Sequence, residues 1–442
     1  MEDIDSIRNE IDKITQEMII LFKKRLELSQ KIGIAKKDVG RKIIDKTREE
    51  QLFNKMQILV SEIGLNKASA GRFVNFLINE SVRVQSIKNN AHLSIFYKAK
   101  EMEKNGKDMI HMEIGEPDFM APKSLQNALS DAYKLGFTKY GMPQGDQTLL
   151  EELAKKHKVM PENIIITHGG RFAVFAAITT LLVPGDEVII IEPAWSAYRQ
   201  CAEFAGVKTK IIKTSIEECW EPSLDDIRKA TSINTKMIIL NYPNNPTGKI
   251  LSNTTLDSIV NLAKENDWYI LSDEVYSTYT YTAFKSILEY NYEKGIVVNS
   301  FSKSHAMTGF RIGYAITHKD IIQKMVKLQA LCITSVSEPI QYAAINAINQ
   351  DTSNNPKIIK NRMNEIIKIA KKANLKFTVP DGAMYLFLDM GRNGSELANS
   401  LLEKGLAVAP GEGFGEYTNF VRISLCSDVK ELISGMKMLI EI

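Results

Sequence analysis

The 442-residue sequence is poor in cysteine, in long apolar runs and in net charge. Its four cysteines form no CxxC pair and no even spacing, which disfavours a disulfide framework or a zinc site and favours reduced thiols in the cytoplasm. No apolar run reaches the ~18 residues of a membrane span, and the opening MEDIDSIRNE is too acidic and polar for a signal peptide. A net charge of +3 is too small to indicate a nucleic-acid partner. We therefore expect a cytoplasmic protein of two or three domains, without a metal, nucleic acid or membrane.

The first 88 residues differ from the rest in charge and in pattern. They hold 17 basic against 13 acidic residues, a net of +4 that leaves −1 for the remaining chain. Apolar residues recur in steps of three and four over residues 4–39, which predicts one helix of about 55 Å. Because 88 residues cannot bury so long a helix, we expect it to pair with a second copy, and further helices at about 46–62 and 68–88. This apolar seam comprises Ile4, Ile7, Ile11, Ile14, Met18, Leu21, Arg25, Leu28, Ile32, Ala35 and Val39.

From about residue 90, short β-rich runs alternate with helix-length segments such as 170–182 and 253–266. This alternation predicts a parallel sheet with crossover helices. In open α/β sheets, ligands bind beyond the carboxyl ends of the strands, so residues directly after each run are candidates for a site. The runs are NIIIT (163–167), DEVIIIE (186–192), TKMIILN (235–241), WYILSD (268–273) and GIVVNS (295–300).

Four of these strand ends carry unusual polar residues. His168-Gly169-Gly170-Arg171 precedes a helix whose N-terminus favours an anion, although such a turn is often only a tight turn. The segment NYPNNPTGK (241–249) is by itself compatible with a surface turn. Asp273, at a buried strand end, requires a cation, and the protonated pyridine nitrogen of pyridoxal phosphate (PLP) is one.

The fourth strand end is SFSKSHAMTGFRIGY (300–314), with Lys303 between two serines. Taken alone, Lys303 would be a solvated lysine. Residues 300–303 also match the S-x-x-K signature of serine acyl-enzymes, but the SDN and KTG motifs that accompany it do not occur in this chain.

In order and spacing, these segments resemble the class I/II aminotransferases of PLP fold type I. The resemblance covers about 94–442 and includes GEPDF (115–119), TKY (138–140), PAWSAY (193–198) and VRISL (421–425). It implies an α/β PLP-transferase fold with a mostly parallel seven-stranded sheet and a small α/β domain. We expect an aminotransferase at 92–442, with a large cofactor domain at about 138–320 and a small domain from about 92–137 and 321–442.

The resemblance also implies roles for individual residues. Lys303 would form the Schiff base with PLP and move the proton between substrate Cα and cofactor C4′, while Asp273 keeps the pyridinium charged. A planar carboxylate is matched by arginine better than by lysine. By the same resemblance, Asn245 and Tyr276 would hydrogen-bond the phenolic oxygen, and Trp195 would stack on the ring. The phosphate would be held by the backbone of Gly169, Gly170 and Arg171, by Ser300 and Arg311, and by the partner subunit's Tyr140. The substrate α-carboxylate would be bound by Arg422 and the backbone of Gly115.

Within the first 88 residues, Arg25 is a charged member of the apolar seam and could simply fix the register of a dimer. Lys36 lies eleven residues further, about three helical turns, and so on the same face. The pattern resembles the all-helical (AroQ-type) chorismate mutases in IRNEID (7–12), LFKKRLELSQKIGIAK (21–36), IIDKTREE (43–50) and ESVRVQ (80–85). By this resemblance, Arg25, Arg48 and the partner subunit's Arg8 would bind the two substrate carboxylates. Lys36 and Gln85 would donate to the ether oxygen, and Asp45 and Glu49 would bind the substrate hydroxyl or orient the basic groups.

The fusion predicts a bifunctional enzyme of aromatic amino-acid biosynthesis. Chorismate would rearrange to prephenate, and the second site would aminate prephenate or phenylpyruvate with glutamate or aspartate as donor. Some relatives specific for acidic substrates carry a lysine where this chain has Thr179, so acidic specificity by that route is not expected. One alternative is an aspartate-type aminotransferase whose mutase-like domain only senses a ligand or dimerises. A PLP-bearing transcription regulator is disfavoured by the long helix and the small excess charge.

Overall fold

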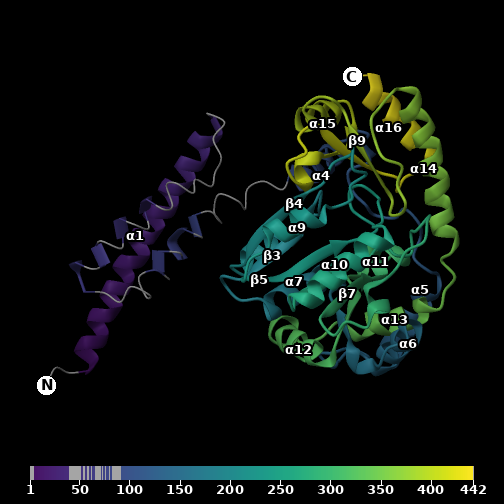
Figure 1. Ribbon diagram of the computed structural model, residues 1–442. Helices are drawn as coiled ribbons and strands as arrows, with labels where there is room; N and C mark the ends of the chain where they lie inside the picture. Colours follow the sequence, from purple (N-terminus) through teal and green to yellow (C-terminus); the bar gives the residue numbers. More distant parts are fainter. Residues whose placement is uncertain are drawn as a thin grey trace. The chain divides into compact units, whose positions relative to one another are not determined.

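The computed structural model describes residues 4–38, 51–52, 55–56, 59–60, 62–64, 71, 73–74, 76–78, 80–81 and 91–441. The chain divides into two compact units, Met1–Asn90 and Ala91–Ile442, and each is described by itself (Figure 1). No helix of the described residues is long and apolar enough to cross a membrane. All four cysteines fall within the described residues and are free thiols.

The first unit contains the long helix expected from the seam, α1 (Ile4–Asp38). Arg25 is half-buried, and its guanidinium donates to the Leu77 carbonyl at 2.6 Å and to the Ser81 hydroxyl. The other helices expected here, about 46–62 and 68–88, lie partly outside the described residues; those described within 51–62 and 71–81 are helical. Seven apolar seam residues are 42–66% exposed in the single chain: Ile7, Ile11, Ile14, Met18, Leu21, Leu28 and Ile32.

The second unit is built on a seven-stranded sheet in the order β2-β8-β7-β6-β5-β3-β4. Only β8 runs antiparallel to its neighbours, so the expected mostly parallel sheet is confirmed. The five β-rich runs form β2, β3, β5, β6 and β7. The strands are β2 (Ile164–Thr167), β3 (Glu187–Glu192), β4 (Lys208–Lys213), β5 (Thr235–Asn241), β6 (Tyr269–Asp273), β7 (Gly295–Ser300) and β8 (Gly313–Ile316).

Both faces of this sheet are buried, which explains the continuous apolar runs. Ile164 and Ile166 join one apolar core and Ile165 joins the other, because alternate side chains of a strand point to opposite faces. The first core is completed by α5 (Ser124–Lys134), α6 (Gln147–His157), α10 (Asn253–Glu265) and α13 (Glu338–Ile348). The second is completed by α7 (Gly169–Leu181), α8 (Ala197–Phe204) and α12 (Lys319–Ile333).

A smaller layer at one end of this unit has its own core (Figure 1). Its strands are β1 (Ile110–His111) paired with β10 (Leu406–Ala407), and the antiparallel sheet of β11 (Ala409–Pro410), β12 (Phe420–Ser424) and β9 (Tyr385–Asp389). The surrounding helices are α4 (Ala91–Lys104), α14 (Asn354–Lys372), α15 (Gly394–Glu403) and α16 (Val429–Glu441). The helices α5, α12 and α13, from the ranges expected for the small domain, pack on the large sheet instead.

The sheet topology brings distant motifs to one edge. Neighbouring parallel strands place Asn241 of β5 beside Asp273 of β6, and β7 ends nearby at Ser300, which pairs with Gly313 of β8. Strand β2 ends at Thr167, on the other side of β8. The polar residues that follow these strands therefore lie together.

Candidate active site

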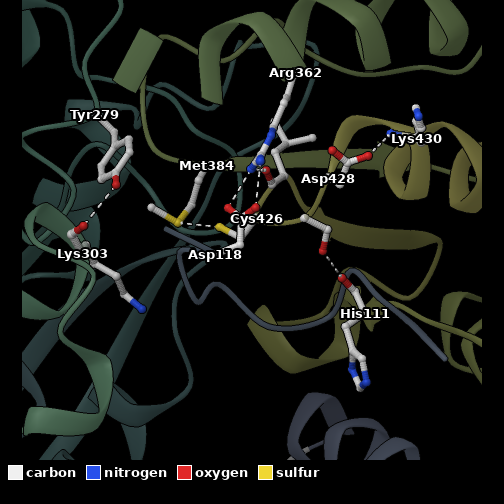
Figure 2. A network of polar contacts seen from close by, with 11 residues as sticks. His111, Asp118, Tyr279, Lys303, Arg362, Met384, Cys426, Asp428 and Lys430 are labelled. Atoms are coloured by element: carbon white, nitrogen blue, oxygen red, sulfur yellow. Dashed lines mark hydrogen bonds and ion pairs between the residues drawn. The ribbon is translucent and has the colours of Figure 1, made fainter. Parts of the chain in front are cut away.

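Lys303 is held at this edge by the short helix α11 (Phe301–Ser304), which directly follows β7. The Ser300 hydroxyl accepts the Ser302 amide at 3.0 Å and donates to the Ile312 carbonyl at 3.1 Å, so it fixes the turn. The Lys303 ammonium donates to the Gly115 carbonyl. The Lys303 carbonyl accepts the Tyr279 hydroxyl at 3.1 Å (Figure 2). Burial lowers the pKa of Lys303 to about 8. Such an amine becomes a neutral nucleophile far more readily than a solvated lysine.

Asp273 ends β6 and is almost fully buried. Its carboxylate accepts the Tyr198 hydroxyl at 2.7 Å and, more weakly, the Val275 amide at 3.3 Å. Burial raises its pKa to about 6, although the Tyr198 hydrogen bond acts in the opposite direction. A buried carboxylate with only neutral donors is stabilised by any cation placed against it.

Two tyrosine hydroxyls meet in the core of the smaller layer. The Tyr276 and Tyr385 hydroxyls are 2.7 Å apart with their rings edge to face. Burial raises the pKa of Tyr276 well above its usual range and that of Tyr385 to about 12, so both remain neutral donors. Gly115 lies against this tyrosine pair, since a Cβ there would be 1.7 Å from the Tyr385 hydroxyl oxygen. The chain can approach so closely only with glycine at this position.

Arg422, in the middle of β12, is buried and has neutral partners. Its guanidinium donates to the Asn245 side-chain oxygen at 2.9 Å and to the Glu113 carbonyl, and lies over the rings of Tyr385 and Phe414 at 4.4 and 4.9 Å. Its Nε has no hydrogen-bond partner among the described residues. A desolvated guanidinium with a free donor is suited to bind a carboxylate.

The first turn of α7 lies beside Arg311. Gly169 has φ +75°, and a Cβ there would be 2.9 Å from Arg311 Nη2. The guanidinium of Arg171, one residue after Gly170, lies 4.7 Å from the centre of the Trp195 ring. Amide groups at a helix N-terminus next to a guanidinium favour an anion such as a phosphate.

The expected residues of the second unit thus lie near one another, with one exception. Tyr140 is 89% exposed in the single chain, and the sequence assigns it to the partner subunit's site. Thr179 hydrogen-bonds the Phe175 carbonyl of its own helix at 2.7 Å and supplies no charge.

In the first unit, the structure describes only part of the expected mutase set. Arg8 is exposed and contacts Asp5 at 3.3 Å, and Arg25 makes the contacts given above. Lys36 belongs to α1, but its side chain lies outside the described residues, as do Asp45, Arg48, Glu49 and Gln85.

Three residues of the site were not predicted. Tyr198 lies in the PAWSAY motif, three residues after Trp195, and this proximity was an available signal. Tyr385 begins the strand β9, where a hydroxyl in an otherwise apolar run is a weaker signal. Glu113 contributes its backbone carbonyl to the site, and a pattern of side chains in the sequence cannot predict a backbone contact.

Both units of the chain are similar to known proteins. Residues 107–435 match the family Aminotransferase class I and II, and residues 7–86 match Chorismate mutase type II. The chain is 34% identical to the aspartate aminotransferase of Thermotoga maritima over 366 residues, which is 80% of this chain and 97% of the relative. It is also 34% identical to the aspartate/prephenate aminotransferase of Thermus thermophilus, over 81% of this chain and 97% of the relative. The crystal structure of the Thermotoga maritima enzyme superposes with a TM-score of 0.78 at 33% identity, covering 81% of this chain and 98% of that chain.

Proposed function

The chain belongs to the class I and II aminotransferases and has an N-terminal chorismate mutase type II domain, and we propose that it uses both to make and then aminate an aromatic-pathway keto acid. The mutase domain would convert chorismate to prephenate. The second unit would transfer an amino group from glutamate or aspartate to prephenate or phenylpyruvate. Arg422 is the observation that carries the transaminase proposal, because a buried guanidinium with neutral partners suits the α-carboxylate that every such substrate has.

Aminotransferases of this family depend on PLP, and the residues at the sheet edge fit that cofactor. Asp273 is a buried carboxylate in need of a cation, and Lys303 is an amine with a lowered pKa. At Gly169 the lack of a side chain lets the Arg311 guanidinium come close to the first turn of α7. When bound, the cofactor supplies the electron sink that makes the substrate Cα–H bond acidic.

The side chains around that cofactor have distinct tasks in this proposal. Lys303 binds the cofactor and then carries the proton at the substrate Cα, and Asp273 holds the ring nitrogen protonated. Asn245 and Tyr276 donate to the phenolic oxygen, and Trp195 covers one face of the ring.

Anions are placed by a second group of residues. Arg311, the Ser300 hydroxyl and the amides of Gly169, Gly170 and Arg171 hold the phosphate. Arg422 holds the substrate α-carboxylate, with the Gly115 backbone beside it.

The exposed seam of α1 supports a homodimer. Seven large apolar side chains along one helix are too costly to leave in water, and a second copy offers a matching seam. In such a dimer, the mutase site combines Arg25, Lys36, Arg48, Asp45, Glu49 and Gln85 with the partner subunit's Arg8, and the partner subunit's Tyr140 completes the phosphate site.

The two activities are separable in the full-length chain by one substitution. Lys303→Ala should abolish transamination and leave chorismate disappearance unchanged, because the mutase reaction needs neither the amine nor the cofactor. Lys319→Ala, at the exposed start of α12, is the matched control and should retain both activities. Loss of chorismate conversion in Lys303→Ala would refute two independent sites. A wild-type chain that never converts chorismate would instead favour a sensing or dimerising role for the first unit.

The preferred keto acid is tested by comparing amino acceptors. Prephenate, phenylpyruvate and oxaloacetate are supplied one at a time, with glutamate and with aspartate as donors, and kcat/KM is compared. We expect prephenate or phenylpyruvate to be preferred as amino acceptor. The fusion of the two domains supports this, as does the aspartate/prephenate aminotransferase among the relatives. A strong preference for oxaloacetate over both would refute the proposed substrate.

A further inference from the structure

His111 lies between two carboxylates in the smaller layer. Its Nδ1 hydrogen-bonds Glu113 Oε1 at 2.8 Å, and its Nε2 lies 3.0 Å from Glu103 Oε1, an ion-pair contact that is not aligned as a hydrogen bond. A neutral imidazole could still donate one N–H to Glu113, but it would carry no charge to attract the second carboxylate, that of Glu103. Both contacts are favourable only with an imidazolium. In agreement, the pKa of His111 is raised, mainly by the hydrogen bond to Glu113 and further by Glu103. Burial acts in the opposite direction but does not outweigh the two carboxylates.

Glu113 depends on this imidazolium more than Glu103 does. The Glu113 side chain is 1% exposed, and its Oε2 has no hydrogen-bond partner among the described residues. Glu103 is 35% exposed and also contacts Lys100 at 2.8 Å. A buried carboxylate without its cation is costly, so the segment could not keep its position after His111 loses its charge.

The same segment supports Arg422. The Glu113 carbonyl accepts the Arg422 guanidinium, and the Met112 carbonyl accepts the Ser424 amide at 2.7 Å, two residues further along β12. The His111 carbonyl accepts the Ser427 hydroxyl at 3.2 Å. Residues 111–113 are therefore attached to β12, whose middle residue is the proposed carboxylate anchor, and to the segment that follows it.

We propose that His111 and Glu113 are positioning residues for Arg422: the imidazolium bridging Glu103 and Glu113 holds the Glu113 carbonyl where it orients the guanidinium toward the substrate carboxylate. The inference rests on the proposed function, in which Arg422 binds that carboxylate. Neither residue contacts the substrate in this proposal. Their removal therefore weakens substrate binding and leaves the proton transfer at Lys303 unchanged.

The charge state of this bridge is set by a small group of residues. Among those that the structure describes, Glu103 with Lys100 behind it faces His111 from α4, and Glu113 faces it from its own segment. The contact from the segment after β12 is the uncharged Ser427 hydroxyl. A histidine with a raised pKa keeps its charge to higher pH than an ordinary histidine and loses it as the pH rises through that pKa. Substrate affinity should therefore fall as the pH rises through the pKa of His111.

The experiment follows the half-reaction of the PLP-loaded full-length chain with L-aspartate, one of the two proposed donors, by the change in cofactor absorbance. His111→Gln should raise the half-saturating concentration of L-aspartate by about tenfold, the effect of losing a hydrogen bond to a charged group. Its maximal rate should stay within about twofold of wild type. Adding Glu113→Gln to this variant should restore most of the affinity, since a neutral amide needs no cation. His318→Gln, at the exposed N-cap of α12, is the matched control and should change neither constant.

The pH profile separates positioning from a merely structural role. The wild-type half-saturating concentration should rise with pH above the ordinary range of histidine, whereas the double variant should be flat. An unchanged constant in His111→Gln, or a double variant no better than the single one, would overturn the inference. Arg422→Lys is measured alongside: if it binds L-aspartate as wild type does, the proposed role of Arg422 itself fails. A defect in Arg422→Lys with none in His111→Gln refutes only the bridge.

Discussion

The hydrogen bond from Tyr198 to Asp273 offers a direct test of how the chain receives its cofactor. Tyr198→Phe removes only the hydroxyl, 2.7 Å from a carboxylate that is 4% exposed. A buried hydrogen bond to a charged acceptor is worth about 1.5–3 kcal/mol, which corresponds to about ten- to hundredfold in affinity. The bond favours the ionised carboxylate, so its loss should raise the pKa of Asp273 further above about 6.

We expect the apoenzyme of Tyr198→Phe to bind PLP at least tenfold more weakly at pH 6, with a smaller defect at pH 8. The sign follows from ionisation: at pH 6 the variant carboxyl is mostly protonated and offers no charge to the ring nitrogen, whereas at higher pH it ionises again. Affinity is measured by quenching of tryptophan fluorescence on titration of the apoenzyme with PLP. Tyr292→Phe loses a comparable hydroxyl contact, 2.7 Å to the Trp268 carbonyl, at the other end of β6, and should bind PLP normally.

A defect of equal size at pH 6 and pH 8 would refute the electrostatic reasoning, since a simple packing loss has no such pH dependence. Unchanged affinity at both pH values would show that Tyr198 does not influence the ionisation of Asp273 in the complex.

Three further outcomes follow from the structure. Burial raises the pKa of Glu274 from 4.5 to about 7. Ionising this carboxyl in the folded chain therefore lowers the free energy of unfolding by about 3 kcal/mol, a loss that grows as the pH rises from 4.5 and is complete above 7. Glu274→Gln should remove most of this pH dependence in urea titrations. Gly169→Ala places a Cβ against Arg311 at positive φ and should lower stability by about 1 kcal/mol and weaken PLP binding, measured by thermal unfolding and by the fluorescence titration. Leu21→Asp in the exposed seam should yield a monomer in sedimentation velocity, whereas Lys23→Asp beside it should remain a dimer; a dimeric Leu21→Asp would place the subunit contact elsewhere.

The large sheet was predictable because burial on two faces leaves a strong local signal. β3 and β5 have almost no exposed residues, so their apolar runs are continuous in the sequence. The two strands that were not predicted lack that signal. β4, at the sheet edge, has only two apolar residues beside three lysines and one threonine. β8 has four residues, and its first two lie in the 300–314 segment that was interpreted as the strand end carrying Lys303.

Site residues that belong to contiguous motifs were predictable, whereas contacts between distant side chains were not. Lys303 and Asp273 each follow a recognisable strand and so could be placed from the sequence. The bond between Tyr198 and Asp273 joins residues 75 positions apart, and it exists only because β6 and α8 meet in the fold. The bridge of His111 to Glu113 is local, but its importance depends on Glu113 being buried and touching Arg422, which spacing alone does not show.

The choice of Arg422 as carboxylate anchor is best argued against a second arginine in the same layer. Arg362 of α14 is also largely buried, but both of its terminal nitrogens contact the Asp118 carboxylate at 2.7 Å (Figure 2). Its charge is already neutralised within the chain, so a substrate carboxylate would have to displace Asp118 to bind it. Arg422 donates to an amide and a backbone carbonyl, and no carboxylate among the described residues pairs with it. Desolvation makes such a cation expensive in the free enzyme, and binding an anion offsets that cost. The unpaired arginine is therefore the one arranged for a ligand, and the paired arginine is the one that holds the GEPDF segment in place.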